Sequence, residues 1–266
     1  MKGKILFVLF ALFIWEACSR VPITNRKQTI MFSENELIAL SLGHYNEFLT
    51  KNQPLPATDA NTQLVRKVGE NIKIAVEKFM KEKKLTKRIE AYKWEFNVVN
   101  SPEINAWCMP GGKVVVYTGL LPVTLTEEGL AVVMGHEIAH AIARHGNERM
   151  SQGALAEFGG AALGAIFQSS NPKASNIFLQ SYGVGSTLGL LKYSRVHESE
   201  ADKLGVVFMA MAGYNPEAAI SFWERMSKAG SGGGPEVLST HPSDETRINA
   251  LKKFMPTAKK YYKPAN

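Results

Sequence analysis

Two patterns of apolar residues alternate along the chain, and each predicts a different kind of element. Between residues 33 and 80 apolar side chains recur every three or four positions, which predicts two amphipathic helices. Ser33 and Asp59 stand where side-chain caps are favoured, and the proline-containing stretch 52–58 separates the two helices. Both helices are interpreted as scaffold.

From residue 90 the apolar period changes from helical to alternating. Residues 92–98 alternate between aromatic or aliphatic and polar side chains, which predicts a strand with one buried face. Residues 104–108 and 113–118 are expected to be two further strands, with Pro110 and two glycines forming the turn between them. We therefore expect a small, mostly antiparallel sheet.

The rest of the chain is predicted to be helical. Thr126 is the expected cap of a strongly apolar helix that runs to about Met150. Later helices are expected over residues 199–211, over residues 217–228, and from Ser243 through Phe254. The expected fold class is α+β, mostly α, with the small sheet beside the apolar helix.

The first residues are interpreted as a targeting segment. Lys2 and Lys4 precede an apolar run, residues 5–15, that is too short to span a bilayer and is typical of a secretory signal. Cys18 directly after Ala17 resembles the site at which a lipoprotein is cleaved and lipidated, while cleavage without lipidation and a retained anchor are the alternatives.

This interpretation divides the chain into three parts. Residues 1–18 form a lipoprotein-type signal peptide, residues 19–32 a polar linker, and residues 33–266 a single domain. It predicts an exported protein of the cell envelope or periplasm, which a lipid on Cys18 holds at the membrane.

Composition narrows the class of protein. The hydrophobic share of 45% and the charged share of 21% are those of an ordinary globular protein. The net charge of +7 is spread through Lys-rich segments such as residues 81–87 and 259–263, which offer no interleaved aromatic platform. A solvated surface is therefore favoured over a nucleic-acid site, and attraction to anionic lipid stays open. Cys108 has no partner within the expected mature chain, so no disulfide framework is predicted.

The apolar helix contains the candidate chemistry. His136 and His140 are one helical turn apart, so both imidazoles leave the same face and can bind one metal ion. Glu137 lies beside the first of them, and the result is the H-E-x-x-H arrangement of zinc hydrolases. The predicted cofactor is one zinc ion per chain.

A catalytic zinc site needs a third protein ligand. The extended pattern with a third His does not fit, because Gly146 stands where that His should be. Glu198 is the best candidate, and Asp202, on the same helical face, is expected to accept the second ring N–H of a liganding His. Glu200 points elsewhere. The alternative is a charged first turn that the helix dipole favours.

These motifs together resemble the gluzincin metalloproteases that include the CAAX prenyl proteases, HtpX and the BepA-like periplasmic proteases. The similar segments are Asn105–Ala106 with residues 110–112, His136–His140 with residues 143–146, residues 193–195 with Glu198 and Asp202, and residues 239–242 with Arg247 and Ile248. The resemblance implies a zincin-like helical domain. The chain lacks the membrane-spanning helices and the helical-repeat tail of those relatives and is expected to be a minimal exported form.

The resemblance also implies roles for individual residues. Glu137 would be the general base that takes a proton from water and returns it to the leaving amine. His241 would stabilise the oxyanion, with two alternatives: it occupies the open zinc position, as in BepA-like relatives, or it caps a turn. Asn105 and Ala106 belong to an edge strand that would pair with extended polypeptide substrates. Arg247 is expected to be structural.

We therefore expect a zinc-dependent endopeptidase of the bacterial cell envelope that hydrolyses misfolded or unassembled proteins. One alternative is a chaperone or assembly factor with latent or little protease activity, and another is a zinc amidase that acts on cell-wall peptide. The intact Glu137 argues against a pure binding protein, and the edge-strand motif favours extended polypeptide.

Residues 154–167 and 182–191 are expected either as a loosely packed helical hairpin over this site or as a plain buried pair of helices. No nucleic-acid partner is expected, and no oligomeric state is predicted.

Overall fold

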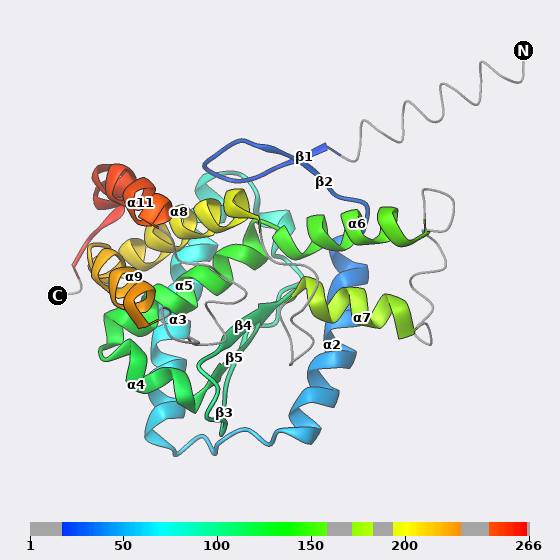
Figure 1. The fold of residues 1–266 in the computed structure, drawn as a ribbon, viewed down its shortest axis with the longest axis horizontal. Coiled ribbons are helices and arrows are strands. Elements are labelled where there is room, and N and C mark those ends of the chain that lie inside the picture. Colours follow the sequence, from blue (N-terminus) through cyan, green and yellow to red (C-terminus); the bar gives the residue numbers. More distant parts are fainter. Residues whose placement is uncertain (1–17, 159–171, 183–193, 230–244, 265–266) are drawn as a thin grey trace, which may run out of the picture.

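The computed structural model describes residues 18–158, 172–182, 194–229 and 245–264 (Figure 1). The strands are β1 (Cys18–Arg20), β2 (Lys27–Thr29), β3 (Glu95–Val99), β4 (Ala106–Met109) and β5 (Lys113–Tyr117). The α-helices are α2 (Glu34–Lys51), α3 (Ala60–Glu82), α4 (Leu121–Thr124), α5 (Glu127–Ile142), α6 (His145–Phe158), α7 (Pro172–Ser181), α8 (Arg195–Met211), α9 (Ala218–Ala229) and α11 (Glu245–Ala258). Short 3₁₀ turns lie at Thr86–Arg88, Thr118–Leu120 and Lys259–Tyr261. The predicted class, α+β and mostly α, is confirmed.

The two scaffold helices begin where the sequence predicts. The side chain of Ser33 accepts a hydrogen bond from the backbone N–H of Glu36, and Glu36 accepts one from Ser33 in return, which is a capping box. Asp59 caps α3 from the same position, and its side chain accepts hydrogen bonds from the backbone N–H groups of Asn61 and Thr62.

The segment expected to be a linker folds onto the domain instead. Strands β1 and β2 pair antiparallel, with Cys18 opposite Thr29, and the hairpin lies above α8 and α6 (Figure 1). Val21, Gln28 and Phe32 are buried in this segment. The segment was expected to be a linker because most of its residues are polar, but these few buried side chains attach it to the domain.

The second sheet has the order β3-β5-β4. Strand β5 pairs antiparallel with β4 but parallel with β3, so the expected mostly antiparallel pairing holds for one of the two pairs. The reason is that the chain leaves β3, forms β4 at the far edge and returns through the middle as β5. Strand β4 is therefore an edge strand, and α5 packs against it.

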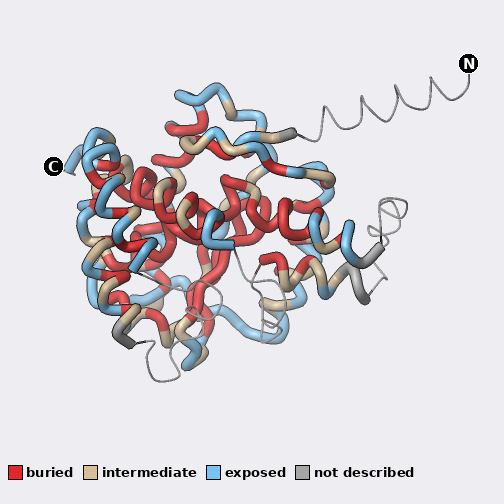
Figure 2. Tube along the Cα trace, turned by 45° about the horizontal axis from the view of Figure 1, so that its top comes forward, coloured by how far each residue is buried: buried red, intermediate tan, exposed pale blue. Residues whose placement is uncertain are grey.

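Strand β5 is buried on both faces, and its alternating side chains enter two separate clusters. Val114 and Val116 pack with α3 and α5, whereas Val115 and Tyr117 pack with α2 and α7. Figure 2 shows the result: buried segments fill the middle of the molecule, and exposed residues lie on the outer helices. This double covering fixes the sheet beside α5.

The metal helix is shorter than expected. Instead of continuing to Met150, α5 ends at Ile142, and Arg144 adopts a φ of +59°, the left-handed conformation that terminates helices. The Arg144 Nε atom lies 3.0 Å from Oε2 of Glu34, an ion pair that holds this turn against α2. The chain changes direction there, and α6 begins at His145.

Helices α5 and α8 approach each other backbone to backbone. A Cβ atom on Gly205 would lie 2.9 Å from the backbone nitrogen of His136, and one on Gly135 would lie 3.0 Å from the carbonyl oxygen of Gly205. The two glycines therefore allow the helices to approach more closely than larger residues would permit. Helix α8 begins at Arg195, four residues before the expected start, with Ser194 as its cap.

Helices α9 and α11 complete the packing around α5 and α8. Among the helices within the described ranges, none combines the length and the apolar character needed to cross a bilayer. Residues 159–171 and 183–193, which include most of the predicted helical hairpin, and residues 230–244, which include His241, lie outside the described residues.

Candidate metal centre

Three buried side chains converge between α5 and α8. The Nε2 atoms of His136 and His140 are 3.1 Å apart. The carboxylate of Glu198 lies 3.5 Å from His136 Nε2 and 3.4 Å from His140 Nε2. Within the part of the chain that the structure describes, this is the group of His, Cys, Asp or Glu residues whose ligand atoms all lie within 4.8 Å of one another.

The local structure explains the convergence. One turn of α5 separates the two histidines, so their rings share a face. Glu198 lies in the first turn of α8, where the helix dipole favours a carboxylate, and the Gly135–Gly205 contact brings that turn close to α5. Two imidazoles and one carboxylate are the ligand set of a catalytic zinc site, and the buried arrangement fits that ion.

Asp202 and Arg247 contact two of the three candidate ligands, His136 and Glu198. Oδ1 of Asp202 lies 3.1 Å from Nδ1 of His136. Arg247 donates to both Asp202 oxygens, at 3.0 and 2.8 Å, and its Nη1 atom lies 2.9 Å from the Glu198 carboxylate. Trp223 stacks on the Arg247 guanidinium with 4.7 Å between the centroid and Cζ.

The sequence predicted a structural role for Arg247, and the structure shows which groups it contacts: the carboxylates of Asp202 and Glu198. It lies on the buried stripe of α11 together with Ile248, Leu251 and Met255. A charged residue at such a position needs a buried partner, and this was the available signal for its contact with the centre.

The charges of the centre favour a cation. Burial lowers the pKa of His136, but hydrogen bonds to Asp202 and Glu198 outweigh it and raise the pKa to about 9. Burial raises the pKa of Asp202, but the positive charge of Arg247 and the hydrogen bond to His136 outweigh it and lower the pKa below its usual value. Two carboxylates therefore face one guanidinium, and the same excess of negative charge that favours a proton on His136 favours a metal ion.

Glu137 is buried on α5, between the two histidines in sequence. Burial raises the pKa of the Cys108 thiol on β4, and the negative charge of Glu137 raises it further. Strand β4 packs against α5, the helix that carries Glu137. Asn105 and Ala106 lie at the start of that strand, where the Asn105 side chain accepts a hydrogen bond from the Ala106 N–H at 2.9 Å.

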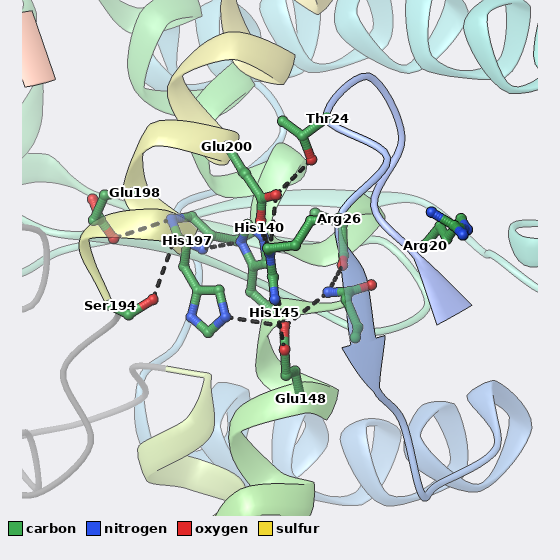
Figure 3. A network of polar contacts seen from close by, with 12 residues as sticks. Arg20, Thr24, Arg26, His140, His145, Glu148, Ser194, His197, Glu198 and Glu200 are labelled. Carbon is green, nitrogen blue, oxygen red and sulfur yellow. Dashed lines mark hydrogen bonds and ion pairs between the residues drawn. The ribbon is translucent and has the colours of Figure 1, made fainter. Parts of the chain in front are cut away.

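A second polar layer lies behind His140 (Figure 3). The Nδ1 atom of His145 is 3.0 Å from Nδ1 of His140, and its Nε2 atom is 3.1 Å from the Glu200 carboxylate. Burial lowers the pKa of His145 to about 4, even though Glu200 opposes the shift, so the ring is neutral at pH 7. Glu200 thus faces away from the metal ligands, toward His145.

Arg26 of the N-terminal hairpin joins this layer. It donates to the carboxylates of both Glu148 and Glu200, and Glu148 also lies 3.0 Å from Nε2 of His197. Burial raises the pKa of Glu148, but hydrogen bonds from Arg26, His197 and Gln28 outweigh it and hold the pKa well below its usual range. In the same way, hydrogen bonds from His145, Arg26 and Thr24 outweigh burial and lower the pKa of Glu200 to about 2.

Sequence reasoning missed Arg26, Glu148 and His197 as neighbours of the centre. Arg26 lies in a segment without a periodic pattern, and its partners are more than a hundred positions away. The break after α5 was also unexpected, and it is this break that turns His145 back toward His140.

Comparison with known proteins adds an independent finding. Residues 67–255 match the model of Peptidase family M48. Mitochondrial metalloendopeptidase OMA1 of Schizosaccharomyces pombe is 33% identical over 90% of this chain and 66% of its own length. Metalloendopeptidase OMA1, mitochondrial, of Homo sapiens is 30% identical over 97% of this chain and 50% of its own length. The beta-barrel assembly-enhancing protease of Escherichia coli is 31% identical over 58% of this chain and 33% of its own length. The chain thus spans between a third and two thirds of the length of these relatives.

These relatives contradict the expected periplasmic location. The two that match over 90% and 97% of the chain are named as mitochondrial proteins, whereas the bacterial protease matches over 58%. The expectation depended on two lysines and a short apolar run, a pattern that indicates a targeting segment but does not name the destination. Lipidation of Cys18 stays a prediction.

Proposed function

The chain belongs to peptidase family M48, and from this membership we propose that it is a zinc-dependent endopeptidase that cleaves extended segments of misfolded or unassembled proteins. The observation that carries the proposal is the buried group of His136, His140 and Glu198, whose ligand atoms lie within 4.8 Å of one another beside Glu137.

Each residue of the metal centre has a distinct role in the proposed reaction. His136, His140 and Glu198 would hold the zinc ion, which when bound polarises the scissile carbonyl and activates water. Asp202 accepts the Nδ1–H of His136, so the Nε2 lone pair faces the centre. Glu137 takes the proton of the attacking water and transfers it to the leaving amine. We propose His241 as a donor to the oxyanion.

The position of β4 supports an extended substrate. It is the edge strand of its sheet and packs on α5, so a peptide added along it would run past Glu137. Strand addition recognises the backbone and tolerates many side-chain sequences, as a protease of unfolded proteins requires.

A second candidate is a factor that holds unassembled proteins with latent or little cleavage. The name of the Escherichia coli relative, which joins beta-barrel assembly with protease, favours this candidate. The two functions differ in whether Glu137 is needed, because binding requires no general base.

The test compares wild type with Glu137→Gln in zinc content and casein digestion. We expect both proteins to retain one zinc ion per chain and the variant to lose cleavage by about 10²-fold or more, the usual contribution of a general base. Glu128→Gln, in the first turn of the same helix, is the matched control and should cleave like wild type. Glu198→Ala should lose the metal.

Each outcome separates the candidates. Wild-type turnover in Glu137→Gln would show that Glu137 is not the base. Binding of unfolded casein without cleavage by wild type would support the holding factor, and the absence of zinc from wild type would overturn the metal centre itself.

A further inference from the structure

Both histidines of the metal centre use Nδ1 for a hydrogen bond, but their partners differ. Nδ1 of His136 meets the carboxylate of Asp202 at 3.1 Å. Nδ1 of His140 meets another imidazole, Nδ1 of His145, at 3.0 Å. A carboxylate can only accept, whereas a neutral imidazole can accept or donate, so the second contact is ambiguous until something fixes the tautomer of His145.

Glu200 removes the ambiguity. Its carboxylate accepts hydrogen bonds from Thr24 at 2.5 Å and from Arg26 at 3.0 and 3.1 Å, and it lies 3.1 Å from Nε2 of His145. Surrounded by donors, Glu200 acts as an acceptor, so His145 presents N–H at Nε2 and a lone pair at Nδ1. His140 must then donate from Nδ1, which leaves the lone pair of its Nε2 atom directed at the centre. That lone pair is the one a metal ligand needs.

Arg26 holds the acceptor in place. Its Nε and Nη2 atoms donate to Glu200, while Nη1 and Nη2 donate to the two oxygens of Glu148 at 2.8 and 2.7 Å. Glu148 and Glu200 are both buried, and a planar guanidinium is suited to bridge two carboxylates. Without Arg26 the carboxylates of Glu148 and Glu200 would repel each other, and Glu200 would lose the guanidinium hydrogen bonds that hold its position.

We propose that Arg26 is a positioning residue of the metal centre, which acts through Glu200 and His145 to orient the ring of His140. Figure 3 shows this relay, from the hairpin on one side to the metal helix on the other. The N-terminal hairpin therefore supports the metal centre through Arg26 and Thr24, which contact Glu200. The inference depends on the zinc centre of the proposed function.

The test measures zinc affinity by competition with a chromophoric chelator. Arg26→Met should bind zinc about 10-fold more weakly than wild type, because partners behind a liganding His typically contribute 10- to 100-fold in affinity. Arg20→Met is the matched control. Arg20 lies in the same hairpin, its Nη1 atom donates to the Asn25 carbonyl at 2.9 Å, and it lies apart from the residues of the relay (Figure 3). This control should match wild type within about 2-fold.

A second variant keeps the test independent of folding. Thr24→Val removes one donor to Glu200 and keeps the shape of the side chain, so we expect a folded protein with a smaller loss of affinity in the same direction. Urea unfolding of the metal-free proteins shows whether each variant is folded before its affinity is compared.

The route is tested by coupling. In a His145→Leu background the side chain can neither accept from His140 nor donate to Glu200, so the relay is broken and Arg26→Met should cause no further loss of zinc affinity, although it should still lower stability. Additive losses of affinity would show that Arg26 acts by another route and would overturn the proposal. Equal affinities of Arg26→Met and Arg20→Met would overturn it as well, whereas failure of wild type to bind zinc would overturn the proposed centre instead.

Discussion

Replacement of Gly205 by Ala tests how the third ligand reaches the two histidines. The added Cβ atom would lie 2.9 Å from the backbone nitrogen of His136 and 3.0 and 3.1 Å from the carbonyl carbon and oxygen of Gly135. These are backbone atoms of a buried helix and cannot rotate aside. Carbon atoms pack best at about 3.5–4.0 Å, so α8 must move away from α5 by roughly 0.5 Å.

The expected cost follows from two opposing effects. Overpacking of this kind costs about 1–3 kcal/mol, and Ala in place of Gly inside a helix returns about 1 kcal/mol. We therefore expect a net loss of up to about 2 kcal/mol, which corresponds to a Tm lower by as much as about 8 °C in a domain of this size.

Gly205→Ala should have a larger effect on the affinity for zinc than on stability. Helix α8 carries Glu198, and metal sites tolerate distance changes of about 0.2 Å. A shift of roughly 0.5 Å should weaken zinc binding by about 10-fold or more, an effect comparable to the loss of a residue behind a ligand.

The assays are thermal unfolding of the metal-free protein and chelator competition for zinc. Gly43→Ala is the control, because Gly43 lies in α2 with no atom within 4 Å of its added Cβ atom. It should gain up to about 1 kcal/mol and keep its zinc affinity. If Gly205→Ala retained the zinc affinity of this control, the close helix contact would not be what positions Glu198.

Two further predictions concern stability. Ser33→Ala removes the side-chain oxygen that accepts from the Glu36 N–H at the start of α2 and should lower the free energy of unfolding in urea by about 1 kcal/mol, and an unchanged value would mean that this side-chain cap contributes nothing. Because the pKa of Glu148 is lowered in the folded protein, its stabilising contribution is present above the unfolded pKa of about 4.5 and is lost as pH falls below it. The stability difference between wild type and Glu148→Gln should therefore narrow between pH 6 and pH 3, and a constant difference would contradict the assigned ion pair.

The features that sequence analysis predicted correctly depend on neighbours in the chain. Ser33 and Asp59 cap the helices that follow them through backbone groups two or three residues away, so the local pattern was sufficient. His136 and His140 are paired by the pitch of a single helix.

The errors concern contacts that the chain makes over long distances. The residue in the left-handed conformation, Arg144, is neither Gly nor Asn, and its ion pair with Glu34 becomes visible only once α2 lies beside it. Strand β5 could not be assigned a parallel neighbour, because its position between β3 and β4 depends on where the intervening chain goes. Arg26 fell within the expected linker, residues 19–32, since both of its carboxylate partners come from helices much later in the chain.

The two ends of the sequence meet at the metal centre, and this has a consequence for biosynthesis. When α5 leaves the ribosome, the growing polypeptide presents two imidazoles without their carboxylate partner, because Glu198 has not been translated, and Arg247, which contacts Glu198, follows later still. A nascent or truncated product therefore lacks a complete zinc cage. Zinc-dependent hydrolysis therefore requires translation through Glu198 and the packing of α8 against α5.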